Sequence, residues 1–168
     1  MQRLWSPWRS KYIGTFSDGS KPKKGESLFT AAWKSKRDAE NLVVWRGTSC
    51  FVIMNRYPYN SGHLMIAPYR QVADFQDLTL VELAEMMQAA QSAIGALKRV
   101  MRPDGYNVGA NLGRVAGAGV ENHVHFHVVP RWNGDTNFMP VLGDTKVVSE
   151  AMRQTYQKLR KSFKKAVS

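Results

Sequence analysis

Three histidines alternate with apolar residues in one short segment, residues 123–129, which reads His-Val-His-Phe-His-Val-Val. Successive side chains of a β-strand point to opposite faces, so a strand here places His123, His125 and His127 on one face and the apolar side chains on the other. Imidazole titrates near neutral pH and serves both as a metal ligand and as a proton-transfer group. The spacing therefore predicts a strand with one chemical face and one packing face.

Two chemistries suit three imidazoles on one face. Zinc binds neutral imidazole, and catalytic zinc sites use three protein ligands with water in the fourth position. Alternatively, one imidazole acts as a nucleophile at phosphorus while its neighbours donate hydrogen bonds to phosphate oxygens and to the leaving group. The three histidines by themselves leave these two alternatives open.

The segment that precedes the histidines, residues 105–119, is rich in glycine and asparagine. Glycine lets backbone amides approach an anion closely, as they do in phosphate-binding loops. The formal net charge of +11 also favours a polyanionic ligand, although it does not distinguish nucleotides from nucleic acid or acidic membranes. Together, the loop and the charge favour phosphate chemistry over a bare metal site.

Several elements must position this segment. Residues 41–57 are mainly apolar and are interrupted by Arg46-Gly47-Thr48, which predicts two strands joined by a turn, and residues 64–67 predict a third strand. Thr79 and Glu82 have capping-box spacing, and apolar residues at helical spacing follow until Pro103. We expect a strand, a glycine-rich loop and a strand between residues 106 and 129, and a C-terminal helix over residues 147–165. These elements predict an α+β fold, an antiparallel sheet with a long covering helix and a C-terminal helix.

Length and composition set the outer limits. A chain of 168 residues with 43% hydrophobic content is expected to form one domain, residues 1–168, with its core at about residues 41–140 and a flexible loop at residues 15–26. The single cysteine, Cys50, lies in an apolar run and is expected to be a buried, inert thiol. Without an apolar signal segment or a membrane-spanning run, we expect a cytoplasmic protein.

The histidine segment resembles the signature of the histidine-triad superfamily, His-φ-His-φ-His-φ-φ with φ apolar. Residues 51–64 resemble the upstream pattern of that family, which is a strand, Asn-Arg-x-Pro, Gly-His and a second strand. With Asn111 and the pair Pro130 and Arg131, the resemblance covers about residues 41–140. Residues 4–9 and 132–140 resemble a bacterial branch that includes diadenosine tetraphosphate phosphorylases.

The resemblance implies a homodimer whose sheets join across the subunit interface. It implies that His125 attacks the α-phosphorus of a bound nucleotide and becomes a nucleotidyl-histidine. His127 contacts the phosphate and supports the leaving group, and His123, linked to His63, orients the nucleophile through a hydrogen-bond relay. All four histidines of the chain fall at family positions.

The resemblance also implies substrate-binding residues. Asn55 is expected at the ribose hydroxyls and Asn111 at the phosphate chain, although Asn55 also suits a simple turn. Backbone amides of the loop are expected to contact phosphate, and the bacterial branch suggests two further pocket residues, for which a turn or core role is an equal alternative. The loop residues are Gly117 and Gly119, and the two branch residues are Asn137 and Phe138.

One departure from many bacterial relatives concerns metal. They carry a Cys-x-x-Cys zinc pair ahead of the first core strands, whereas the corresponding segment here is Ser27-Leu28-Phe29-Thr30, which has no thiolate. We therefore expect no structural zinc and no other metal.

The expected function is that of a nucleotidyltransferase that cleaves diadenosine polyphosphates through a nucleotidyl-histidine, with inorganic phosphate as co-substrate and no resident cofactor. A dinucleoside polyphosphate hydrolase and a nucleoside phosphoramidase are alternatives within the same superfamily. A nucleic-acid-binding module is the alternative from a different class, and it predicts steeply salt-dependent binding.

Overall fold

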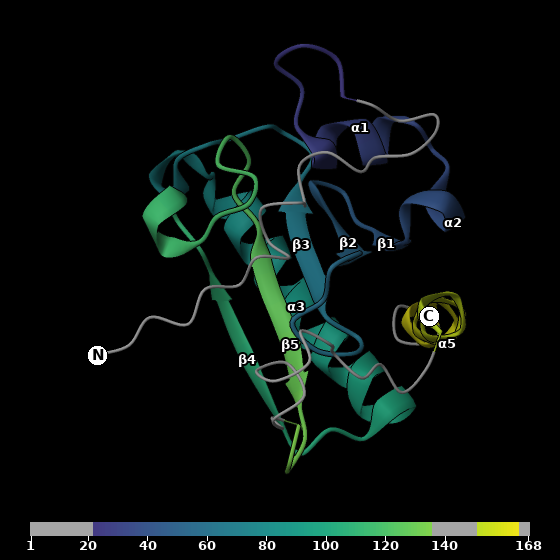
Figure 1. Cartoon of the computed structure of the whole chain (residues 1–168). Helices are drawn as coiled ribbons and strands as arrows, with labels where there is room; N and C mark the ends of the chain where they lie inside the picture. Colours follow the sequence, from purple (N-terminus) through teal and green to yellow (C-terminus); the bar gives the residue numbers. More distant parts are fainter. Residues whose placement is uncertain (1–21, 136–150, 165–168) are drawn as a thin grey trace, which may run out of the picture.

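The computed structural model describes residues 22–135 and 151–164 of the chain. Its centre is a five-stranded antiparallel sheet with the strand order β1-β2-β3-β5-β4, which is seen in Figure 1. In chain order the strands are β1 (Val43–Arg46), β2 (Cys50–Met54), β3 (Leu64–Pro68), β4 (Gly105–Ala110) and β5 (Phe126–Arg131). The predicted strands and their antiparallel arrangement are confirmed.

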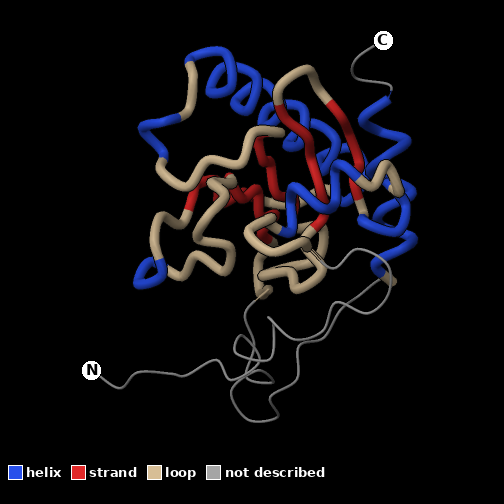
Figure 2. Tube along the Cα trace, turned by 90° about the horizontal axis from the view of Figure 1, so that it is seen from above, coloured by secondary structure: helices blue, strands red, loops and turns tan. Residues whose placement is uncertain are grey.

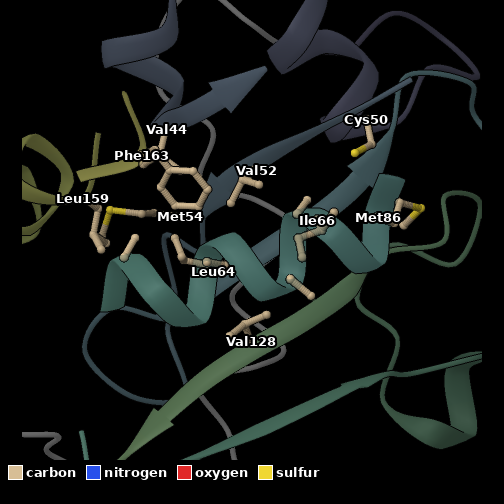
Figure 3. Packing of buried hydrophobic residues seen from close by; sticks show 14 of the residues in the cluster. Val44, Cys50, Val52, Met54, Leu64, Ile66, Met86, Val128, Leu159 and Phe163 are labelled. Atoms are coloured by element: carbon tan, nitrogen blue, oxygen red, sulfur yellow. The ribbon is translucent and has the colours of Figure 1, made fainter. Parts of the chain in front are cut away.

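Helix α3 (Leu80–Met101) covers one face of the sheet. Its predicted capping box is present, because the Thr79 hydroxyl accepts from the backbone N–H of Glu82 and the Glu82 carboxylate accepts from that of Thr79. Figure 3 shows side chains of β2, β3 and β5 pointing toward this helix. The labelled strand residues among them are Val52, Met54, Leu64, Ile66 and Val128.

The buried face of α3 differs from the expected one. Leu80 and Met87, which belong to the apolar pattern in the sequence, are 83% and 40% exposed, whereas Met86 is fully buried. Small side chains let a helix lie close to a sheet, and alanines dominate the buried face here. The buried residues are Glu82, Met86, Ala89, Ala90, Ala93, Ala96 and Leu97.

Helix α5 (Met152–Lys164) lies within the predicted C-terminal helix. Tyr156, Leu159 and Phe163 are buried in the same core as α3, and the Tyr156 hydroxyl donates to the carbonyl of Val43 in β1 over 3.2 Å. The basic residues of α5, which include Lys158 and Lys161, therefore lie on a helix that packs against the core. In the view from above, the strands lie together and the helices lie outside them (Figure 2).

Two short helices that the sequence did not predict precede the sheet. Helix α1 (Leu28–Lys34) and helix α2 (Asp38–Asn41) begin before the expected start of the core. Phe29 and Ala32 of α1 pack against strand residues on the sheet face opposite α3, with Phe51 and Met65 among them. This second face is the one that carries the histidines.

The histidine segment is only partly a regular strand. Of the three histidines, His127 lies in β5, where it pairs with Met65 of β3 and Gly109 of β4, whereas His123 and His125 precede the strand. The chain is nevertheless fixed there, since the N–H of Val124 donates to the carbonyl of Val72 over 2.7 Å. The predicted separation into a chemical face and a packing face holds, but the strand begins three residues later than expected.

Short 3₁₀ helices at η2 (Phe75–Asp77) and η3 (Arg114–Ala116) complete the described elements. Cys50 is fully buried, as expected, and burial raises the pKa of its thiol to about 12. Over residues 22–135 and 151–164, none of the helices has the length and apolar character that a bilayer crossing needs.

Candidate active site

The four histidines gather on one face of the sheet. His63 and His123 are fully buried, and His125 and His127 are nearly so. The ring centre of His127 lies 5.0 Å from that of His63 and 4.9 Å from that of His125. Residues far apart in the chain thus form one compact cluster.

His125 has one ring nitrogen committed and one available for attack. Its Nδ1 lies 2.9 Å from the carbonyl oxygen of His123, and because a carbonyl only accepts, Nδ1 carries the proton. In the neutral ring, Nε2 then holds a lone pair. Burial lowers the pKa of His125 below its ordinary value, although the hydrogen bond to the carbonyl opposes part of that effect. A neutral imidazole with its lone pair on Nε2 is a competent nucleophile near pH 7.

His63 and His127 form a relay with a defined direction. The backbone N–H of Tyr59 donates to Nδ1 of His63 over 3.1 Å, and the Asn55 amide nitrogen lies 3.3 Å from the same atom. Since Nδ1 of His63 accepts, its Nε2 carries the proton and donates to Nδ1 of His127 over 2.9 Å. His127 is therefore protonated at Nε2, which can donate to a substrate oxygen.

The expected link between His63 and His123 is wrong. The register of β3 and β5 pairs Met65 with His127, so His63 is a diagonal neighbour of His127 on the same face. His123 lies beyond the end of this ladder and has other partners. The sheet register, which the sequence did not reveal, decides this contact.

A glycine places His63 at the start of β3. Gly62 has φ +79°, a left-handed conformation, and a Cβ there would lie 2.5 Å from the Met101 sulfur. The N–H of His63 also donates to the carbonyl of Asn60 over 3.1 Å, which closes the turn. The Gly-His pair of the sequence pattern therefore has a steric reason.

His123 is held by groups that the sequence did not identify as functional. Its Nε2 donates to the carbonyl of Pro68 over 2.9 Å, and its Nδ1 lies 2.5 Å from the Ser27 hydroxyl and 3.4 Å from that of Thr30. Burial lowers the pKa of His123 to about 4; the Pro68 carbonyl opposes this shift and His125 adds to it. In the sequence, Ser27 and Thr30 stand out only because they replace a cysteine pair. The local signal that could have marked Ser27 is a serine at an N-cap position.

An open pocket of about 480 Å³ borders His127. It extends along β5 and β4, and His125 is not in its wall. Asn111 lines it, and the Asn111 amide lies 3.4 Å from the Tyr59 hydroxyl; its phosphate contact stays a prediction. The lining residues are Tyr59, Asn60, Asn107, Val108, Gly109, Ala110, Asn111, His127, Val129, Arg131 and Asp135.

The other predicted binding residues have different positions. Asn55 is buried beside the relay, where its Oδ1 accepts from the N–H of Tyr57 over 2.9 Å. Gly117 follows η3 with φ +90°, and its carbonyl lies 3.5 Å from the Asn111 amide, whereas Gly119 is exposed. Neither glycine lines the pocket, and their phosphate contacts stay predictions. Asn137 and Phe138 lie outside the described residues.

Among the residues that the structure describes, no group of three His, Cys, Asp or Glu side chains is arranged to hold a metal ion. The histidine nitrogens instead face one another, two backbone carbonyls and a serine hydroxyl.

The five-stranded sheet, the long covering helix and the buried histidines on the opposite face define the HIT fold. The chain belongs to the HIT domain family, whose model matches residues 36–134. It is 45% identical over 158 residues to the AP-4-A phosphorylase of Mycobacterium tuberculosis, which covers 92% of this chain and 80% of the relative. The bis(5'-nucleosyl)-tetraphosphatase (asymmetrical) of Schizosaccharomyces pombe is 30% identical over 101 residues, or 60% of this chain and 55% of the relative.

Solved structures show the same fold. A zinc-bound histidine triad family protein from Mycobacterium smegmatis superposes with a TM-score of 0.69 at 23% identity, covering 86% of this chain and 98% of that one. The NitFhit protein of C. elegans matches with a TM-score of 0.59 at 26% identity, covering 71% of this chain and 27% of that one.

Proposed function

We propose that this protein is a dinucleoside polyphosphate phosphorylase that transfers a nucleotidyl group through His125. The observation that carries the proposal is the pair of ring nitrogens fixed by the hydrogen bonds: a lone pair on Nε2 of His125 beside a proton on Nε2 of His127. The 45% identity to an AP-4-A phosphorylase over most of both chains supports diadenosine tetraphosphate as the substrate class.

The first step is attack by Nε2 of His125 on the α-phosphorus. A phosphorus–nitrogen bond forms, the bond from phosphorus to the bridging oxygen breaks, and the electron pair leaves with the polyphosphate. Nε2 of His127 donates a hydrogen bond to that oxygen, and the His63 relay supports His127 as negative charge develops. With diadenosine tetraphosphate, the products of this step are adenylyl-His125 and ATP.

The second step removes the nucleotide from His125. An oxygen of inorganic phosphate attacks the phosphorus, the phosphorus–nitrogen bond breaks, and ADP leaves. Because each displacement is in line, the acceptor approaches from the side that the first leaving group vacated. The pocket beside His127 suits both the leaving polyphosphate and the incoming phosphate, since it borders the proton donor His127 and not the nucleophile His125. Asn111 in its wall supplies an amide donor for phosphate oxygens.

We also propose that two copies associate through β4. This strand is the outer strand of the sheet, and among the described residues no strand pairs with its outer edge. Val108 on β4 and Leu112 just after it are 47% and 48% exposed. An open strand edge with apolar side chains is suited to pairing with a second copy. Light scattering is expected to give a mass in solution of twice the chain mass. Val108→Lys is expected to shift this mass toward that of a single chain. A monomeric parent protein would refute the dimer.

The reaction is proposed to need no resident metal, because the attacking nitrogen, the proton donor and the amide donors come from the chain itself. Treatment with a tight chelator, followed by removal of the chelator, is expected to leave the rate of adduct formation unchanged. Loss of that rate, with recovery on adding zinc, would contradict this part of the proposal.

Product analysis tests the function directly. The parent protein is incubated with diadenosine tetraphosphate with and without inorganic phosphate, and nucleotides are separated by anion exchange. ATP and ADP in equal amounts are expected with phosphate. ATP and AMP regardless of phosphate would identify a hydrolase instead. Quenching in alkaline denaturant is expected to trap an acid-labile nucleotidyl adduct that His125→Ala lacks and that Leu80→Ala, at an exposed helix position, retains.

A further inference from the structure

A cluster of hydroxyl and amide groups lies against the ring of His123. Ser27 and Thr30 are 3% and 6% exposed, and they come from the first turn of α1. The Ser27 hydroxyl lies 2.5 Å from Nδ1 of His123, and the Thr30 hydroxyl donates to Oε1 of Gln71 over 3.1 Å. Gln71 is itself oriented, because its amide nitrogen donates to the carbonyl of Gly25 over 3.0 Å.

The direction of each hydrogen bond in this cluster follows from its partners. Nε2 of His123 faces the carbonyl of Pro68 and must carry the proton, so Nδ1 of the neutral ring is an acceptor. The Thr30 hydroxyl proton is directed to Gln71, and the Thr30 N–H donates to the Ser27 oxygen over 3.0 Å. The proton of Ser27 is therefore directed to Nδ1 of His123.

The same histidine supplies the acceptor that orients the nucleophile. The carbonyl of His123 receives the Nδ1 proton of His125, and this bond leaves Nε2 of His125 as the attacking atom. A continuous path thus runs from the Ser27 hydroxyl through the ring and the backbone of His123 to the ring of His125.

We propose that Ser27 is a positioning residue for the nucleotidyl-transfer reaction. Its hydroxyl donates to Nδ1 of His123 and, with the Pro68 carbonyl at the opposite ring nitrogen, holds the ring in one position, and thereby keeps the carbonyl of His123 aimed at Nδ1 of His125. This inference rests on the proposed function and adds a residue to it that contacts neither the reacting atoms nor the pocket.

Ser27 also connects this path to α1. Its side chain caps the helix by accepting from the N–H of Thr30, and two residues later Phe29 places its ring centre 4.7 Å from that of His125. One side chain therefore begins the helix that packs on the nucleophile and fixes the histidine that orients it. The two roles must be separated experimentally, because loss of an N-cap hydroxyl by itself costs about 1 kcal/mol of stability.

Three substitutions at this position separate the roles. Ser27→Ala removes both the cap and the bond to His123, whereas Ser27→Gly removes the bond but keeps an N-cap residue that costs only a few tenths of a kcal/mol. Ser27→Thr retains a hydroxyl for both roles. Ser35→Ala is the matched control, since Ser35 ends the same helix and its hydroxyl donates to the carbonyl of Ala32.

Two measurements are made on each full-length variant. Long-range ¹H–¹⁵N spectra report the protonation and hydrogen bonding of each ring nitrogen of His123, and rapid quench gives the rate of nucleotidyl-His125 formation from diadenosine tetraphosphate. We expect Ser27→Ala and Ser27→Gly to shift the Nδ1 resonance of His123, which loses its hydrogen-bond donor, and to slow adduct formation about 10- to 100-fold, the usual range for a lost supporting contact. Ser27→Thr and Ser35→Ala are expected to stay within about twofold of the parent.

Two results would overturn the inference. One is an unchanged Nδ1 resonance of His123 together with an unchanged adduct rate in Ser27→Gly. The other is a loss in Ser27→Ala that Ser27→Gly does not share, because capping alone would then explain it. If the parent itself forms no adduct, the proposed function fails, whereas the spectra of His123 still decide whether Ser27 holds its ring.

Discussion

Nε2 of His63 lies 2.9 Å from Nδ1 of His127, and this hydrogen bond fixes which nitrogen of His127 carries a proton. The two residues are 64 positions apart in the chain and become neighbours because β3 and β5 pair antiparallel with Met65 opposite His127.

Replacing the relay donor is expected to affect poor leaving groups most. His63→Phe keeps a ring of similar size but removes the donor to His127, so His127 loses its fixed tautomer. With diadenosine tetraphosphate, the rate of adduct formation is expected to fall by about 10²-fold or more, in the range typical of lost proton-transfer support. With the p-nitrophenyl ester of AMP, whose leaving group needs little protonation, the fall should be less than about tenfold. Equal losses for both substrates would contradict a leaving-group role.

The acid limb of the pH–rate profile is expected below the ordinary histidine pKa of 6.5. Burial lowers the pKa of His125, and attack requires its unprotonated Nε2, so kcat/KM falls only when the pH drops through that lowered value. A profile of kcat/KM from pH 4.5 to pH 8 checks this, with stability confirmed at each pH. An acid limb at or above pH 6.5 would show that His125 is solvated in the free enzyme.

Acid is expected to weaken the fold through Glu82. The Arg70 guanidinium and the backbone and hydroxyl of Thr79 hold the pKa of Glu82 at about 2, against burial, which raises it. Since this pKa is below the unfolded value of 4.5, the stabilisation is present above pH 4.5 and is lost as the pH falls toward 2. Urea unfolding is expected to show Glu82→Gln about 1 to 3 kcal/mol less stable than the parent at pH 7, and this deficit is expected to shrink to well under half near pH 2.5. The control Glu40→Gln, at an exposed position, should leave the free energy of unfolding unchanged at both pH values. A stability deficit of Glu82→Gln that does not depend on pH would contradict the role of the carboxylate.

Adjacent methionines of α3 are expected to behave oppositely. Met86 is fully buried, so Met86→Ala leaves a cavity and is expected to cost about 2 to 5 kcal/mol of unfolding free energy. Met87 is 40% exposed, and Met87→Ala should change stability by less than about 0.5 kcal/mol. Chemical denaturation of the two variants beside the parent checks the face of the helix, and comparable losses for both would show that the buried face is broader than described.

Much of the architecture follows from local patterns in the sequence. The strand over Cys50–Met54 is a continuous apolar run, the start of α3 is a capping box at Thr79, and α5 has apolar residues at helical spacing. Each of these signals acts between residues a few positions apart, so the sequence carries it without knowledge of the fold. The alternation around His125 is likewise local, and it separated the chemical face from the packing face.

Contacts between distant segments needed the tertiary structure. The family resemblance implied a link between His63 and His123, but sheet register places His63 beside His127. The apolar spacing in the sequence included Leu80 and Met87, but both side chains are exposed on α3. Ser27 gave no chemical signal, because a serine before a short helix is ordinarily a cap.

The sequence by itself determined that three imidazoles share a face, that a glycine-rich loop leads into them, and that the chemistry suits phosphate. Only the tertiary structure decided which nitrogen of each imidazole holds a proton, because a histidine tautomer is set by the acceptor or donor that faces each nitrogen. For His125 that partner is the carbonyl of His123, for His127 it is His63, and for His123 it is Pro68 on one side and Ser27 on the other.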